Sequence, residues 1–176
     1  LALREGDRAR TGIVLATANA TVSKLSGLAD EAAGFLDLGL EQRLAATAPL
    51  PEQTADRNLT ADLVGGMGDY RWGLDLRDTD GGRPMELERG ERIEIAFRNR
   101  TGMSHPMHLH GHGFQIVAIG ETRFAGARRD TVLVPPGSSV TIAFDADNPG
   151  RWMLHCHHLY HMAAGMMTTL NYRGVG

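Results

Sequence analysis

The histidines of this sequence are gathered in a pattern that points to metal chemistry. All eight fall into two groups: His105, His108, His110 and His112, and then His155, His157, His158 and His161. The single cysteine, Cys156, lies inside the second group, and Met166 follows it on the same stretch of chain. Scattered structural histidines would not sort themselves in this way, so the clustering indicates a metal site.

A β-strand would divide these side chains between its two faces. Residues i and i+2 of a strand point to one side and residue i+1 to the other. His155 and His157 would then share a face, while Cys156 would point away from them. If the segment around residue 109 is also extended, His108 and His110 share a face. Together these pairs would offer four imidazoles to one polynuclear site and leave Cys156 for a different metal.

That second metal has a recognisable set of ligands. A cysteine thiolate, two histidines and a distant methionine thioether form the trigonal copper site used for electron transfer. Cys156, His161 and Met166 lie close enough in sequence to come from one loop, and His105 would come from a neighbouring segment. Met167 is the alternative to Met166 as the thioether ligand. The spacing from Cys156 favours Met166.

Two motifs carry a family resemblance. His-Pro-Met-His-Leu-His-Gly-His and His-Cys-His-x-x-x-His-x-x-x-x-Met resemble the C-terminal copper motifs of multicopper oxidases, the group that contains laccases and bacterial copper-resistance oxidases. The resemblance runs from Met67 to Tyr172; residues 1–60 more weakly resemble the end of a preceding domain and its linker. It implies type 1 copper at His105, Cys156, His161 and Met166, type 2 copper at His108, and the type 3 pair at His110, His155 and His157.

The resemblance also implies a reaction and a partner. A small reducing substrate would lose single electrons at type 1 copper, and these would pass through Cys156 to a trinuclear copper cluster that reduces dioxygen to water. His112 and His158 match no ligand position, so this chain supplies only half of the cluster's imidazoles. An N-terminal cupredoxin domain of the same gene product, or of another chain, would supply the rest. We therefore expect one part of a copper-dependent, laccase-like oxidoreductase, periplasmic or secreted as most of that family is.

Three other interpretations compete with this one. A stand-alone blue-copper electron-transfer protein would need only His105, Cys156, His161 and Met166, which leaves the other paired histidines without a role. A zinc site would be satisfied by four ligands, fewer than the histidines gathered here. A copper nitrite reductase does not normally place histidines on both sides of its copper cysteine.

The rest of the chain predicts an all-β fold that could position these motifs. Short alternating segments separated by Gly and Pro turns are typical of a β-sandwich or barrel. We predict strands at residues 9–17, 84–87, 92–98, 114–119, 131–134, 140–144, 152–155 and 166–172. One or two helical turns are expected within 23–48 and a connector at 49–60. The resemblance makes 63–176 a cupredoxin-like Greek-key domain and 1–62 the end of a preceding domain plus linker.

Composition excludes some partners. Eighteen basic and 21 acidic residues give a net charge of -3, which offers no electrostatic reason to bind nucleic acid or an anionic membrane. No apolar run is long enough for membrane insertion. The sequence thus predicts a copper protein whose partners are another cupredoxin domain, dioxygen and a small reductant.

Overall fold

The chain forms two compact units, described here separately. The computed structural model describes residues 1–83 and 85–175, which divide into Leu1–Asp37 and the part from Leu38 onward. In the first unit only two very short strands form, β1 (Ala2–Leu3) and β2 (Arg10–Thr11), paired antiparallel. The strand predicted over 9–17 is wrong beyond Thr11. A strand needs a face to bury, and Ile13 and Leu15 are 85% and 92% exposed.

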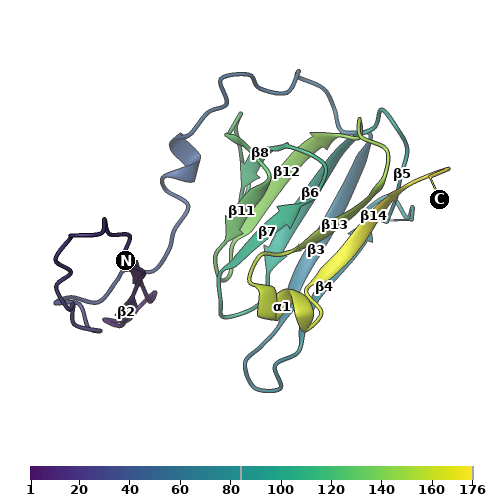
Figure 1. The fold of residues 1–176 in the computed structure, drawn as a ribbon. Coiled ribbons are helices and arrows are strands. Elements are labelled where there is room, and N and C mark those ends of the chain that lie inside the picture. The colour runs from purple at the N-terminus through teal and green to yellow at the C-terminus, as the bar shows by residue number, and fades with distance from the viewer. Residues whose placement is uncertain (84, 176) are drawn as a thin grey trace. The chain divides into compact units, whose positions relative to one another are not determined.

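The second unit is a sandwich of two β-sheets (Figure 1). The larger sheet contains β10 (Arg128–Arg129), β8 (Phe114–Ile119), β12 (Ser139–Asp145), β6 (Arg92–Asn99), β3 (Arg57–Gly65) and β4 (Trp72–Asp78) in that order, with β9 (Thr122–Arg123) beside β8. The smaller sheet contains β11 (Thr131–Val134), β7 (His105–Leu109), β13 (Arg151–Cys156), β14 (Met167–Tyr172) and β5 (Glu86–Leu87) in that order. The prediction of an all-β sandwich is confirmed.

The core lies between the two sheets because their strands alternate in polarity. On β6 and β12 of the larger sheet, Ile95, Phe97 and Ile142 are fully buried. From the smaller sheet, Met107 and Leu154 join the same cluster. Burying an aliphatic or aromatic side chain of this size stabilises the fold by roughly 1.5–3 kcal/mol relative to leaving it exposed. The core therefore fixes the inward face of β7 and β13, the strands that carry the two motifs.

Six strands lie within one residue of their predicted bounds at each end, namely β6, β8, β11, β12, β13 and β14. Of the segment predicted at 84–87, Glu86–Leu87 form β5, and Pro84 lies outside the described residues. A single 3-10 turn, Glu41–Arg43, forms within 23–48. The short helix α1 (Leu159–Ala163) was not predicted.

The connector predicted over 49–60 ends earlier than expected. β3 begins at Arg57 and pairs in parallel with β6, so it belongs to the sandwich. The polar start of β3 is explained by Arg57, whose guanidinium binds the buried carboxylate of Asp78 at 2.6 Å. The boundary expected between residues 62 and 63 falls inside this strand. That residues 1–62 include the end of a preceding domain stays a prediction.

Candidate metal centre

The two histidine groups meet on neighbouring strands of the smaller sheet. β7 lies between β11 and β13, and its antiparallel register with β13 sets His108 opposite His155 and Met107 opposite Cys156. The inward positions of these strands carry His105 and Cys156 among core residues, while His108 occupies the other face of β7. One sheet thus separates two clusters, as the period of two predicted.

The inner cluster brings together the cysteine and two imidazoles. Cys156 Sγ lies 3.6 Å from His105 Nδ1 and 3.8 Å from His161 Nδ1, and the two Nδ1 atoms are 3.2 Å apart. A single metal ion with bonds of about 2.0–2.1 Å to nitrogen and about 2.3 Å to sulfur would hold its ligand nitrogens about 3.4 Å apart, and nitrogen and sulfur about 3.6–3.8 Å apart. The three ligand atoms are therefore already spaced for one small metal ion.

A hydrogen-bond chain fixes which nitrogen His105 presents. The Thr101 hydroxyl lies 2.6 Å from His105 Nε2 and 2.8 Å from Asn99 Oδ1. The amide oxygen can only accept, so the hydroxyl donates to it and accepts from the ring. His105 Nε2 then carries the proton, which leaves Nδ1 free toward Cys156. Metal-binding histidines commonly have their other nitrogen held in this way. Thr101 and Asn99 were not predicted to belong to the site, because neither is a usual ligand of copper.

Burial sets the protonation of the inner cluster. Desolvation, followed by the neighbouring imidazoles of His161 and His158, lowers the pKa of His105 to about 4. Desolvation also lowers the pKa of His161 and raises the pKa of the Cys156 thiol to about 11. The imidazoles are thus neutral and ready to bind at pH 7, while a metal ion must displace the thiol proton.

Of the two candidate methionines, Met166 is the buried one whose backbone bonds to the cluster residues. It is fully buried, its carbonyl accepts from the Cys156 N–H at 3.0 Å, and its N–H donates to the His161 carbonyl at 3.0 Å. Met167 is 40% exposed and sits opposite His155 on β14. The backbone bonds hold Met166 beside both proposed ligands, which favours it over Met167.

Aromatic rings cover the inner cluster from the larger sheet. The indole of Trp72, the first residue of β4, stacks on His161 with centroids 4.1 Å apart and meets His105 edge-on at 5.3 Å. Tyr70 contacts Trp72 edge-on at 6.1 Å and adopts a positive φ of 53°. The Trp72 N–H of the backbone donates to Ala164 just after α1. Trp72 therefore keeps water from the cluster; its position 33 residues before His105 gave no sequence signal of this role.

The outer cluster brings together three imidazoles. His108, His110 and His155 offer ring nitrogens that all lie within 4.8 Å of one another, and the Nε2 atoms of His110 and His155 are 2.9 Å apart. His108 Nδ1 donates to the Asp130 carbonyl at 2.7 Å, and His155 Nδ1 donates to the Cys156 carbonyl at 2.9 Å. Both rings therefore present Nε2 to a metal. Burial, and then the neighbouring imidazoles, lower the pKa of His110.

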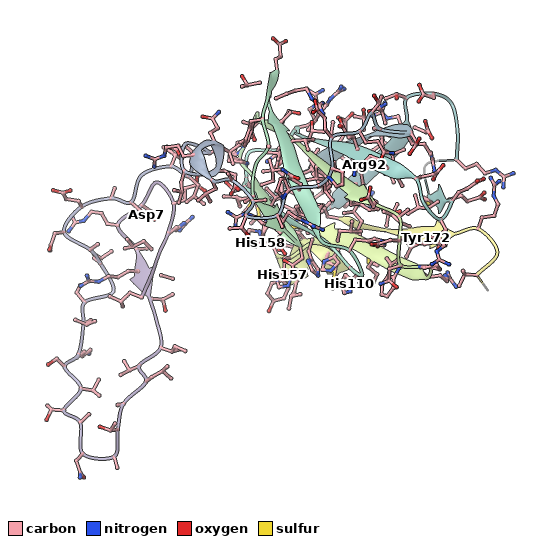
Figure 2. All side chains as sticks on the ribbon, turned by 90° about the horizontal axis from the view of Figure 1, so that it is seen from above. Asp7, Arg92, His110, His157, His158 and Tyr172 are labelled. Carbon is pink, nitrogen blue, oxygen red and sulfur yellow. The ribbon has the colours of Figure 1, made fainter. Side chains whose placement is uncertain are left out.

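The remaining histidines lie in different places. His157 is exposed, with its ring 6.0 Å from His155 and 5.6 Å from His108, just outside the close outer group. His112 is buried, stacks on Tyr172 and bonds its hydroxyl at 2.7 Å, which makes it a structural residue. His158, which matches no ligand position of the motifs, places a ring nitrogen within 4.8 Å of the inner ligand atoms. In Figure 2 the labelled His110, His157 and His158 lie along the same edge of the ribbon.

These donors fit copper. The inner set of one thiolate and two imidazoles, with a thioether beside it, is the ligand set of an electron-transfer copper site, and an all-imidazole cluster also suits copper. Within residues 1–83 and 85–175, no helix has both the length and the apolar character that crossing a bilayer requires.

Comparison with known sequences gives consistent matches. Residues 52–174 match the family model described as "Multicopper oxidase". The chain is 40% identical over 128 residues to multicopper oxidase MmcO of Mycobacterium tuberculosis, a match that covers 73% of this chain and 25% of that protein. It is 38% identical over 110 residues to a copper resistance protein A homolog of Pseudomonas syringae pv. tomato, a match that covers 62% of this chain and 18% of that protein. The chain thus spans a quarter or less of these relatives.

Solved structures give the same answer for the fold. The blue copper oxidase of Nitrosomonas europaea superposes with a TM-score of 0.57 at 26% identity, covering 74% of this chain and 48% of that one. The McoA multicopper oxidase of Aquifex aeolicus gives a TM-score of 0.56 at 27% identity, and the match covers 72% of this chain and 31% of that one. The cupredoxin-like prediction for the sandwich is therefore confirmed.

Proposed function

This chain belongs to the multicopper oxidase family, and on that premise we propose that it is the part of a laccase-like oxidase that holds type 1 copper and half of a trinuclear copper cluster. The complete enzyme would oxidise a small reductant by single electrons and reduce dioxygen to water with four. The proposed type 1 ligands are His105, Cys156, His161 and Met166; His108 would bind type 2 copper, and His110, His155 and His157 the type 3 pair.

One observation carries the proposal. Two clusters of side chains that could each hold metal lie on opposite faces of one sheet and are joined by a single peptide bond, because Cys156 of the inner cluster follows His155 of the outer one. The His155 Nδ1–H also donates to the Cys156 carbonyl at 2.9 Å, which ties the imidazole to the cysteine a second time. Such a short connection suits a protein that passes electrons between two metal sites.

Neighbouring residues set which ring nitrogen of a histidine carries its proton and keep water from the inner cluster. Copper bound at these clusters would supply the one-electron chemistry. Thr101 keeps the proton of His105 on Nε2, and the Asp130 carbonyl keeps that of His108 on Nδ1. Trp72 excludes water from the inner cluster, so a reductant would meet the covering rings and not the ligands. This arrangement supports electron transfer without a dedicated substrate pocket.

The outer cluster supports a second domain as partner. His110 is half-buried and His157 exposed, so part of the cluster faces outward from this sheet. The four imidazoles His108, His110, His155 and His157 satisfy two metal ions at most, since such ions accept two to three imidazoles each. We propose that an N-terminal cupredoxin domain of the same gene product supplies the rest, and that the protein is periplasmic or secreted, as the family resemblance suggests.

The rival function is a blue-copper electron carrier, and copper stoichiometry separates the two. The chain alone should bind one tight copper and take up little dioxygen, whereas the longer protein should show type 3 absorption beside the blue band. Copper well above one per chain with sustained dioxygen uptake, in the absence of a partner polypeptide, would contradict the half-cluster proposal. A longer protein with the blue band alone would favour the carrier.

A further inference from the structure

His158 lies beside the inner cluster although it is not a member of either motif. One of its ring nitrogens lies within 4.8 Å of the ligand atoms of His105, Cys156 and His161. Its ring meets that of His161 edge-on, with centroids 5.1 Å apart. The three other members are buried, and His158 alone among the four is exposed. It therefore stands between solvent and a set of ligands that solvent does not reach.

The backbone holds His158 at this position. It lies two residues beyond the end of β13 and is the N-cap residue of α1, where its carbonyl accepts from the N–H groups of His161 and Met162 at 2.9 and 3.0 Å. The turn that brings His161 back to Cys156 thus also fixes the backbone of His158 near the cluster. Its side-chain torsions can then bring the ring nitrogen, which lies within 4.8 Å of the other ligand atoms, to the roughly 3.4–3.8 Å that ligands of one ion require.

We propose that His158 is a fourth protein ligand of the Cys156 site and gives it a tetrahedral set of one thiolate and three imidazoles. Such a set suits Zn²⁺ or Co²⁺, because these ions prefer four tetrahedral nitrogen and sulfur ligands. Binding would convert the Cys156 thiol to a thiolate and release its proton to solvent. The proposal rests on the metal-binding role of Cys156 given above and adds an ion that the copper site would capture when copper is scarce.

His158 and Met166 offer different fourth ligands. The imidazole is a stronger donor for a divalent ion such as Zn²⁺, whereas the thioether suits Cu⁺. Met166 is fully buried, whereas His158 is exposed. A tetrahedral divalent ion should therefore depend on His158 and be little affected by loss of the thioether.

Cobalt is the probe that tests this, because tetrahedral Co²⁺ has strong visible bands and a thiolate–cobalt band in the near ultraviolet. The metal-free chain is titrated with Co²⁺ alone, and Zn²⁺ is then added to displace it. Cys156 is the only cysteine, so the near-ultraviolet band reports this site and not the imidazole cluster. We expect the unaltered chain to show both signals, and His158→Ala to lose the tetrahedral bands and bind Co²⁺ at least about tenfold more weakly.

One variant serves as a control. Tyr160→Ala removes an exposed ring from the same helix and should keep the tetrahedral cobalt spectrum. An unchanged cobalt affinity and spectrum in His158→Ala would overturn the fourth-ligand proposal while leaving the Cys156 site in place. If the unaltered chain gave no thiolate–cobalt band at all, the metal site at Cys156 would itself be in doubt. Near-ultraviolet circular dichroism of each metal-free variant checks that it folds.

Discussion

Replacing Thr101 with valine should weaken the inner metal site without touching a ligand. Valine keeps the shape of threonine but removes the hydroxyl that accepts the proton of His105 Nε2 at 2.6 Å. His105 is completely buried, so its N–H would lose its partner at a cost of about 1–3 kcal/mol in the free energy of unfolding. The ring can avoid this cost by moving its proton to Nδ1, which is the nitrogen that faces Cys156.

That tautomer cannot bind a metal at Nδ1. We therefore expect Thr101→Val to lower copper affinity by about 10–100-fold, the usual effect of losing a residue that orients a metal-binding histidine. Urea unfolding of the metal-free chain and competition titration of the copper-loaded chain measure the two effects. Thr101→Ser keeps the hydroxyl and should restore both, and Thr122→Val, on the exposed strand β9, should change neither. Unaltered copper affinity in Thr101→Val would refute the assignment of the His105 tautomer.

Three further predictions concern the same cluster and its support. The lowered pKa of His105 means that the unfolded chain binds more protons below pH 6.5, and the raised pKa of Cys156 means that the folded chain keeps its proton longer above pH 9. Urea unfolding of the metal-free chain should thus show greatest stability between these values and a loss of roughly 2 kcal/mol toward pH 4 and toward pH 11; a flat profile would contradict it. Met166→Leu should leave the site blue and raise its reduction potential, with less effect from Met167→Leu; redox titration with the reverse ranking would mean that the wrong methionine was chosen. Gly111→Ala should lower the free energy of unfolding in urea by at least about 1 kcal/mol, because Gly111 has a φ of +72° and a Cβ there would lie 2.3 Å from a carbon of the Trp152 indole. Unaltered stability would contradict this.

The motifs were predictable from sequence because strand geometry alone divides their side chains. The alternation His155–Cys156–His157 predicts the thiol and the imidazoles on opposite faces of a strand; β13 separates His155 from Cys156 in this way, and His157 lies just beyond its end. The place of Cys156 in the inner cluster could be predicted in the same way, because a lone cysteine flanked by histidines indicates a metal ligand. The strands around them were also predictable, because Gly and Pro turns bound short alternating segments.

What the sequence did not reveal depends on contacts between distant residues. Trp72 reaches His161 across the sandwich, and the pairing of β3 with β6 that places β4 there has no local signature. His158 sits off the motif, and only the turn into α1 brings it to the cluster. Residues 12–16 show the opposite error, because an apolar run predicts a strand only where another surface covers it.

The central claim is that Cys156 supplies the thiolate of a type 1 copper site, and the visible spectrum of the copper-loaded chain tests it most directly. The unaltered chain should show the intense blue band of a thiolate–copper bond, and Cys156→Ser should lose that band completely, because the sequence holds no other cysteine. Circular dichroism of the variant confirms that its sandwich is intact. A blue band that persists in Cys156→Ser, or one that never forms in the unaltered chain under saturating copper, would contradict the account.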